Sequence, residues 1–286
     1  MSARPAEPAL ALLASRVGRE EKRLLLELRR RGIPVAQVDT EDLCFDAWAD
    51  GCPWRFALNR EIGYHRAVQA ARSLQARGVR VVNSAEATEV CGDKWRSALA
   101  LERAGLPTPR TVLALSPGAV SGALDAVGYP AVMKPLVGSW GRMVSLVPDA
   151  RTGQSLAGYV AALPHPQARM VCVQPYLGGG REMRVLVAGG EPVAAMWRRS
   201  EDWRGNVALG GTGEYCAPEA EPAKLAVAAA AAVGAGIAGV DLIETADGVH
   251  VLEVNHRVEF MGLQAAAADR VDIASRLVDH ILREVR

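Results

Sequence analysis

Three oxygen-bearing side chains occupy a stretch near the carboxyl end of the chain that otherwise has the pattern of an apolar hairpin. The stretch is GVDLIETADGVHVLEVNHRVEF, residues 239–260, and it carries Asp241, Glu253 and Asn255. A three-residue loop, ADG, with Gly248 in a left-handed conformation is a common way to close such a hairpin. That loop would pair residue 245 with residue 249, set Asp241 opposite Glu253 and place Asn255 on the same face.

Two carboxylates directly opposite each other destabilise a sheet unless something neutralises them. The predicted face also carries the apolar residues Ile243 and Val251, so solvation is a poor explanation for the pair. A hard divalent cation would resolve the conflict, and carboxylate and amide oxygens without Cys or His favour Mg²⁺ or Mn²⁺. The alternative is a two-residue DG turn, which shifts the register by one residue and sends the carboxylates to opposite faces as ordinary edge charges.

Cations that could hold the phosphates of a metal-bound nucleotide lie earlier in the chain. Lys134 ends a buried strand in YPAVMKP, where a cation is costly without an anionic partner, and the Gly-rich loop GSWGR follows it. A strand lysine with a flexible glycine loop is one way to hold a polyphosphate without a Walker A motif, which this sequence lacks. Lys94 in CGDKW is a second candidate. The structural alternatives are a snorkelling edge lysine at 134 and a solvated surface lysine at 94.

The elements that must position these residues change character along the chain. The first ninety residues alternate strand and helix patterns, from LALLAS and REEKRLLLELRRRG to VRVVN, which predicts a small α/β domain with a parallel sheet. Residues 84–128 predict a helical connection, a strand and a further helix. From residue 129 the pattern changes to strands joined by Gly-rich turns. The segment 225–240 predicts an Ala-rich packing helix that leads into the hairpin, and an amphipathic helix over 271–285 follows it.

Composition and charge narrow the classes of protein. The 286 residues are 50% apolar and 23% charged, which suits a soluble chain of one to three compact lobes. Thirty-three Lys and Arg against 32 Asp and Glu leave a net charge of +1, so no global field indicates a nucleic acid or a membrane as a partner. The five cysteines include no C-x-x-C pair, which argues against a disulfide framework or a zinc ribbon and favours a reducing cytoplasm.

Taken together, the motifs resemble those of the ATP-grasp superfamily, whose members hold ATP between two α+β lobes and use it to activate a carboxylate. The resemblance covers essentially the whole chain and rests on DKW, YPAVMKP, GSWGR, VQPYL and GVDLIE…LEVN, in that order. It implies an α/β ATP-grasp fold in three parts. Residues 1–90 would form an N-terminal parallel-sheet (pre-ATP-grasp) domain, residues 91–175 a small central lobe, and residues 176–286 a C-terminal antiparallel-sheet lobe with the Mg-ATP site.

Within that superfamily the chain is most similar to the LysX-type ligases, related to RimK, in NSAEATEVCGDKW, AGLPTPRT, KPLVGSWGR, RRSEDW and EVNHRVEF. This resemblance implies an enzyme that phosphorylates the C-terminal glutamate of a small acidic amino-group carrier protein and couples the acyl phosphate to the α-amine of an amino acid. It also implies ATP and Mg²⁺ (or Mn²⁺), and a homodimer or homotetramer. The alternatives are a RimK-like ligase that extends another protein or peptide C-terminus, and a non-catalytic ATP-binding regulator.

The resemblance also implies a role for each site residue. Lys134 and Arg184 are expected to act in catalysis: Lys134 with Lys94 would neutralise phosphates, and Arg184 in GREMR would hold the developing acyl phosphate in its fork of donors. A strand arginine paired with Glu182 is the structural alternative for Arg184. The metal ligands would be Asp241, Glu253 and Asn255. The remaining expected contacts are Gly138, Ser139, Trp140 and Gly141 over the nucleotide, Gln174, Pro175, Tyr176 and Leu177 at the adenine, Arg198, Arg199 and Asn206 at a carrier or substrate carboxylate, and His256, Glu259 and Phe260 in the amino-acid pocket.

Four positions depart from the family pattern. Leu209 stands where the family has the arginine of an Arg-Gly-Gly, so one anion contact is missing or moved. Met261 and Gly262 replace a lysine and an asparagine, and Arg257 occupies a site that is normally smaller and uncharged. These departures predict an amino-acid substrate other than α-aminoadipate or glutamate, in a specialised rather than a primary biosynthetic pathway.

Overall fold

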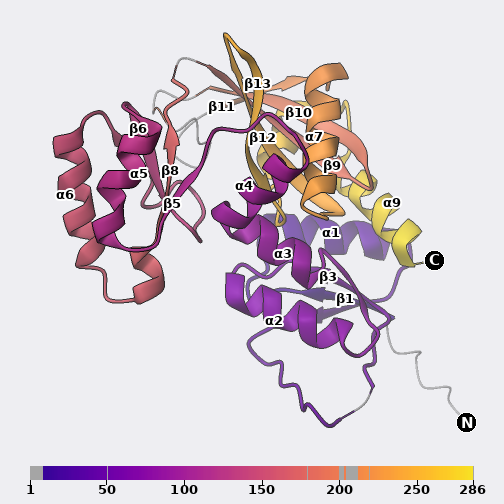
Figure 1. The fold of residues 1–286 in the computed structure, drawn as a ribbon. Coiled ribbons are helices and arrows are strands. Elements are labelled where there is room, and N and C mark those ends of the chain that lie inside the picture. The colour runs from indigo at the N-terminus through magenta and orange to yellow at the C-terminus, as the bar shows by residue number, and fades with distance from the viewer. Residues whose placement is uncertain are drawn as a thin grey trace, which may run out of the picture.

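The computed structural model describes residues 9–49, 51–178, 180–199, 203, 212–218 and 220–285 of the chain. In these ranges the strands form three sheets, each with its own helices (Figure 1). The strands of the first sheet lie within residues 1–90, those of the second within 91–175 and those of the third within 176–286. None of the described helices combines the length and the apolarity that a membrane crossing requires.

The first sheet is parallel, as the alternating strand and helix patterns predicted. Its strand order is β2-β1-β3-β4, formed by Val35–Val38, Leu10–Leu13, Phe56–Asn59 and Arg80–Val82. Helix α1 (Arg19–Arg30) packs on the face that carries Leu12, and helix α2 (Tyr64–Gln75) packs on the face that carries Leu13. Because helices cover both faces, β1 is buried along its whole length, which explains its continuous apolar sequence.

The second sheet is antiparallel and presents one apolar face and one polar face. Its order is β5-β8-β6-β7, formed by Val112–Ala114, Val171–Pro175, Ala131–Pro135 and Ser145–Val147. Helices α5 (Val120–Val127) and α6 (Ala150–Ala161), with 3-10 turns at Pro117–Ala119 and Pro166–Arg169, contribute to the apolar face. Alternation along the strands therefore leaves Lys134 and Gln174 on the opposite face. Helices α3 (Ala85–Gly92) and α4 (Lys94–Arg103) precede this sheet in the chain.

The third sheet is antiparallel, with the order β11-β10-β9-β12-β13. These strands are Thr212–Cys216, Glu191–Arg199, Arg181–Ala188, Ile237–Thr245 and Gly248–Asn255. Helix α7 (Ala220–Ala232) covers one face through Ala226, Ala229 and Ala230, whose small side chains let the helix approach the sheet closely. Helices α8 (Met261–Ala267) and α9 (Ile273–Val285) pack into the cluster on the other face.

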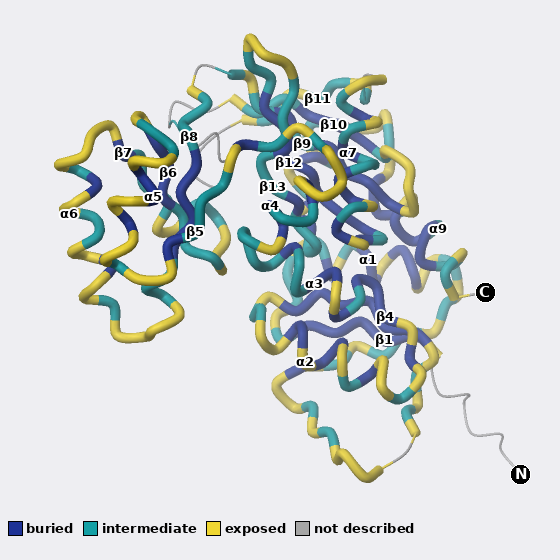
Figure 2. The backbone as a smooth tube through the Cα atoms, in the orientation of Figure 1, coloured by how far each residue is buried: buried dark blue, intermediate teal, exposed yellow. Residues whose placement is uncertain are grey.

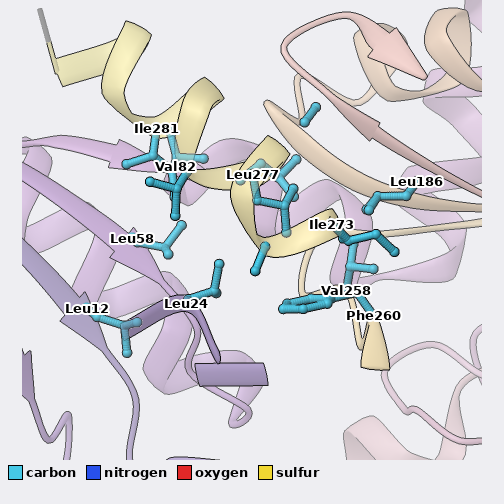
Figure 3. Close-up of a cluster of buried hydrophobic side chains, with 14 of the residues drawn as sticks. Leu12, Leu24, Leu58, Val82, Leu186, Val258, Phe260, Ile273, Leu277 and Ile281 are labelled. Atoms are coloured by element: carbon cyan, nitrogen blue, oxygen red, sulfur yellow. The ribbon is translucent and has the colours of Figure 1, made fainter. Parts of the chain in front are cut away.

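One buried cluster joins the first sheet to the third (Figure 3). Leu12 and Leu24 belong to it from the N-terminal side, and Leu186 and Ile273 from the C-terminal side. Asn83, which follows β4, adds polar contacts across the same boundary: its amide donates to the carbonyls of residues 237 and 256 at 2.7 Å each and accepts from the N–H of residue 237 at 3.0 Å. Figure 2 shows buried backbone in both sheets. The two sheets therefore form one packed unit.

Candidate active site

The hairpin that carries the three oxygen-bearing side chains closes differently from the prediction. Thr245 pairs with Gly248, so the loop has two residues rather than three, and the predicted loop is wrong. This turn alone would have sent the carboxylates to opposite faces. A bulge next to Asp241 restores the alignment, because Leu252 is an extra residue on β13 and Asp241 stands opposite Glu253. The predicted pairing of the two carboxylates is therefore confirmed.

The bulge also changes which apolar residue accompanies the carboxylates. Val251 was expected on their face, but it is fully buried in the core beneath α7. Leu252 lines the cavity in its place, beside Ile243 and Glu253. Two consecutive residues of β13, Leu252 and Glu253, thus face the same side, which regular alternation forbids and a bulge permits.

Asp241 lies at the centre of a buried cluster of charges. Arg184 donates from Nε and Nη2 to its two oxygens at 2.7 Å each, and Arg198 Nη1 lies 3.2 Å from Oδ1. Asn255 Nδ2 is 3.3 Å from Oδ2. A carboxylate has about four acceptor positions, so these contacts occupy them all. Burial alone would raise the pKa of Asp241, but the two guanidiniums outweigh it and hold the pKa below the usual 3.8.

Arg184 and Arg198 contribute more donors than Asp241 can accept. Their side chains are 15% and 7% exposed, and Arg198 Nε is buried with no hydrogen-bond partner among the described residues. The predicted alternative, a pairing of Arg184 with Glu182, is not what the structure has. Both guanidiniums therefore retain capacity for a further anion in the cavity.

The two lysines expected at the phosphates lie near the same carboxylates. Lys94 Nζ donates to the carbonyl of Gly138 at 2.9 Å and lies 3.2 Å from Glu253 Oε1. Lys134 Nζ donates to Gln174 Oε1 at 2.7 Å, and burial lowers its pKa. The side chain of Lys94 is only 14% exposed, so it is not a solvated surface lysine. Both lysines line the cavity.

These groups surround a cavity of about 680 Å³. It is lined by all three parts of the chain, with Arg19 and Tyr64 from the first, Lys134 and Gln174 from the second, and Arg184 and Asp241 from the third. The residues predicted over the nucleotide, Gly138, Ser139, Trp140 and Gly141, line it as well, as do those predicted at the adenine, Gln174, Pro175, Tyr176 and Leu177. The ring of Tyr176 lies edge-on to that of Trp203, with the centroids 5.9 Å apart.

The two arginines predicted as a basic patch at the end of β10 lie in two different environments. Arg198 points into the cavity, but the neighbouring Arg199 is 75% exposed and pairs with Glu214 on β11 at 2.8 Å. Arg199 does not line the cavity with Arg198, because adjacent residues of a strand face opposite sides of the sheet. Its expected role at a carrier carboxylate stays a prediction. Asn206, together with Leu209, lies outside the described residues.

The residues predicted in the amino-acid pocket, which follow Asn255, also lie in two environments. His256 and Glu259 line the cavity as predicted, but Phe260 is fully buried in the cluster between the first and third sheets. The prediction that Phe260 shapes the amino-acid pocket is therefore wrong: its ring anchors the segment from behind. Burial, with the nearby charges of Arg60 and Arg257, lowers the pKa of His256 to about 4, so this imidazole is neutral at pH 7.

Two features of the cavity were missed by the sequence reasoning. Glu182 lines it, and burial together with the charge of Asp241 raises the Glu182 pKa to about 7. The sequence placed Glu182 on the face of Arg184 only as a structural ion-pair partner, and its position in the cavity was not expected. The second is a network under the pocket, where Glu21 Oε1 accepts from Arg60 at 2.9 Å and from Arg257 at 3.1 Å. No local pattern indicates it, since its members are far apart in sequence.

The oxygen-bearing side chains of the hairpin are suitable ligands for Mg²⁺. The described residues include no group of three or more His, Cys, Asp and Glu side chains suited to a metal, so an all-protein cage is absent from them. Two carboxylates and an amide, Asp241, Glu253 and Asn255, are instead a set that Mg²⁺ takes together with phosphate oxygens. Because the acceptor positions of Asp241 are occupied, a metal there must replace at least one donor, such as Arg184.

Comparison with known proteins agrees with this geometry. Residues 91–281 match the RimK-like ATP-grasp domain, and residues 10–90 match the LysX pre-ATP-grasp domain. The chain belongs to the RimK-like ATP-grasp family. It is accordingly an ATP-grasp ligase, and the resemblance to LysX-type and RimK-type enzymes is confirmed.

Relatives of this RimK-like ligase cover nearly its full length. A protein named glutamate–LysW ligase ArgX, from Sulfurisphaera tokodaii, is 30% identical over 278 residues, which are 95% of this chain and 97% of the relative. A RimK domain ATP-grasp protein from Sphaerobacter thermophilus has a TM-score of 0.77 at 26% identity and covers 96% of this chain and 99% of its own. The ATP-grasp ligase PsnB, solved with a minimal precursor, Mg and ADP, has a TM-score of 0.74 at 20% identity over 100% of both chains, a likeness that shows the fold alone.

Proposed function

We propose that this ligase uses ATP and Mg²⁺ to join the α-amine of an amino acid to the side-chain carboxylate of the C-terminal glutamate of a small acidic carrier protein. The observation that carries the proposal is the convergence of Lys94, Lys134, Arg184 and Arg198 on one cavity, against the carboxylate of Asp241 and its neighbours. Anionic ligands would meet a surplus of donors there. The match of residues 10–90 and the likeness to a glutamate–LysW ligase favour a carrier protein as the acceptor.

The residues of the chain would divide the work by position. Lys94 and Lys134 would neutralise phosphate charge, and the segment from Gln174 to Leu177 would hold the adenine. When bound by Asp241, Glu253 and Asn255, Mg²⁺ would supply charge neutralisation at the β and γ phosphates. Two anions must approach each other before the phosphoryl group can move, so this neutralisation is the main physical task of the site.

Arg184 and Arg198 would receive the carboxylate that is activated. A guanidinium binds a carboxylate or an acyl phosphate in a two-donor fork, and Arg184 already holds such a fork on Asp241. Transfer of the γ-phosphoryl group to the carrier carboxylate leaves ADP and an acyl phosphate. The amine, after losing a proton, then attacks the acyl carbon, and phosphate leaves as the amide forms. Arg184 would stabilise the oxyanion through both steps.

The mass of the carrier tests this proposal. The ligase is incubated with Mg-ATP, a small acidic carrier that ends in glutamate, and a panel of amino acids, and the intact mass of the carrier is read. We expect one amino-acid residue to be added, with one phosphate released per addition. A parallel sample contains a carrier whose last glutamate is replaced by glutamine. Modification of both carriers, or of neither across a broad panel, would contradict the proposal; extension of an unrelated peptide C-terminus alone would favour the RimK-like alternative.

A further inference from the structure

The Gly-rich loop, residues 136–144, is attached to the rest of the molecule at two places. At its base, the backbone N–H of Lys94 donates to the carbonyl of Leu136 at 2.9 Å, and Lys94 Nζ donates to the carbonyl of Gly138 at 2.9 Å. Near its tip, Trp140 Nε1 donates to Glu259 Oε1 at 3.2 Å. The second attachment joins the central part of the chain to the C-terminal part, across the cavity.

The backbone of the loop is strained, although the guanidinium of Arg142 lies over the Trp140 ring, 4.8 Å from its centre. Trp140 and Met143 both have φ values of +58°, in the left-handed region that residues with a Cβ adopt only at a cost. The turn hydrogen bonds within the loop are long, at 3.3 Å from Arg142 N to Ser139 O and from Val144 N to Gly141 O. A strained conformation with weak internal bonds persists only when outside contacts determine it. The bond from Trp140 to Glu259 is such a contact.

Glu259, in contrast, stands on a rigid base. Val258 and Phe260 on either side of it are 1% and 0% exposed in the core between the first and third sheets. Arg257 Nη1 lies 3.6 Å from Glu259 Oε1 and steers the carboxylate. Arg257 is itself fixed, because its Nε donates to the carbonyl of Arg60 at 2.8 Å and its Nη2 to Glu21. The carboxylate oxygen of Glu259 that accepts from Trp140 therefore also lies beside a fixed cation.

We propose that Glu259 is a positioning residue, which holds Trp140 and thereby fixes the Gly-rich loop over the nucleotide, rather than a group that contacts the amino-acid substrate. The inference rests on the proposed function, since it takes the ligand beneath the loop to be the nucleotide. Its physical basis is that Oε1 of Glu259 accepts the Trp140 hydrogen bond with the fixed Arg257 guanidinium 3.6 Å away. Among the described residues, this bond is the side-chain hydrogen bond that links the strained tip of the loop to the C-terminal part of the chain. Loss of this bond frees the tip, and the bound nucleotide then leaves faster.

The release of a fluorescent ADP analogue from the ligase, measured by stopped flow with Mg²⁺ present, tests the inference without a carrier. Trp140→Phe keeps an aromatic ring but removes the donor, and Glu259→Ala removes the acceptor. We expect each to speed release by roughly threefold to tenfold, the effect of one partly exposed hydrogen bond to a charged group. Glu259→Gln retains an amide oxygen as acceptor, so it should restore release to within about twofold of the parent rate. The matched control is Trp48→Phe, because Trp48 is 92% exposed and does not line the cavity.

The pattern across variants separates positioning from substrate contact. The double variant Trp140→Phe/Glu259→Ala should release the analogue no faster than either single variant, since both remove one bond. Unchanged release in Trp140→Phe, additive effects in the double variant, or a Glu259→Gln variant as impaired as Glu259→Ala would each overturn the inference. A raised KM for the amino acid with unchanged release would do the same. If the parent protein bound no nucleotide, the proposed function would fail together with the inference; normal binding with no effect of the variants refutes the inference alone.

Discussion

Replacement of Asp241 by alanine should unfold the ligase more readily as well as inactivate it. The change leaves Arg184 and Arg198 facing each other with side chains only 15% and 7% exposed and without their shared carboxylate. Breaking a buried ion pair by removing one partner costs about 3–5 kcal/mol. Because the cluster borders a cavity that admits water, we expect the lower end, about 3 kcal/mol of lost unfolding free energy.

Urea denaturation followed by circular dichroism measures this loss as a fall in the midpoint. Glu214→Ala is the matched control, since it breaks the exposed pair with Arg199 in the same sheet and should cost under about 1 kcal/mol. A second experiment combines Asp241→Ala with Arg198→Met, which removes one of the two unpaired charges. The double variant should therefore lose less unfolding free energy than the two single variants lose in total. An Asp241→Ala variant no less stable than Glu214→Ala would refute the charge-cluster argument, and normal ATP turnover in it would refute the metal assignment.

Three further expectations concern the scaffold, each measured by urea denaturation. Asn83→Ala should lower the unfolding free energy by roughly 2–3 kcal/mol, because it removes the side-chain partner of backbone groups of residues 237 and 256. A loss below about 0.5 kcal/mol, as for an average surface change, would contradict this role. Gly189→Ala should lower the unfolding free energy by roughly 2–4 kcal/mol, since φ is +60° and a Cβ would lie 2.6 Å from His280 Nδ1. Gly190→Ala, with φ of +77° and open space around the Cβ, should lower it by about 1 kcal/mol. Equal losses in the two variants would exclude the clash with His280. Hydrogen bonds from Arg30, the last residue of α1, and from Arg31, which follows it, lower the pKa of Glu27 from 4.5 to about 2. The stabilising contribution of Glu27 is therefore present above pH 4.5 and is lost as pH falls towards 2. Glu27→Gln should lose less stability than the parent between pH 5 and 3, and identical losses would argue against this.

The parts of the site that could be predicted from sequence are those held by local pattern. Lys134 lies at the end of a buried strand and precedes a glycine loop, and both features can be recognised within a dozen residues of the sequence. The pairing of Asp241 with Glu253 was predicted correctly but from a wrong loop length. The hairpin loop is one residue shorter than expected, and the bulge at Leu252 restores the pairing. A bulge leaves no clear mark in a single sequence, because the extra residue, Leu252, is as apolar as Val251 before it.

Other parts could not be predicted because they depend on which surfaces meet. Phe260 and Glu259 are adjacent in an apolar-polar stretch, and only the packing of the first sheet against the third decides that Phe260 enters the core. The same packing brings Glu21 and Arg60 beneath Arg257, the residue that departs from the family pattern. Arg257 is therefore held by an ion-pair network.

The sequence by itself indicated the parallel sheet of the first ninety residues, the family, and the residue types that can hold a nucleotide and a metal, because strand and helix patterns and spaced motifs are local properties of the chain. The tertiary structure decided which of those residues share a cavity, which ion pairs they form and how their pKa values shift. Asp241 is saturated by two guanidiniums, Glu182 has a pKa raised to about 7, and Glu259 holds Trp140 from across the cavity. Burial and long-range charge act through space, and they exist only once distant segments are packed together.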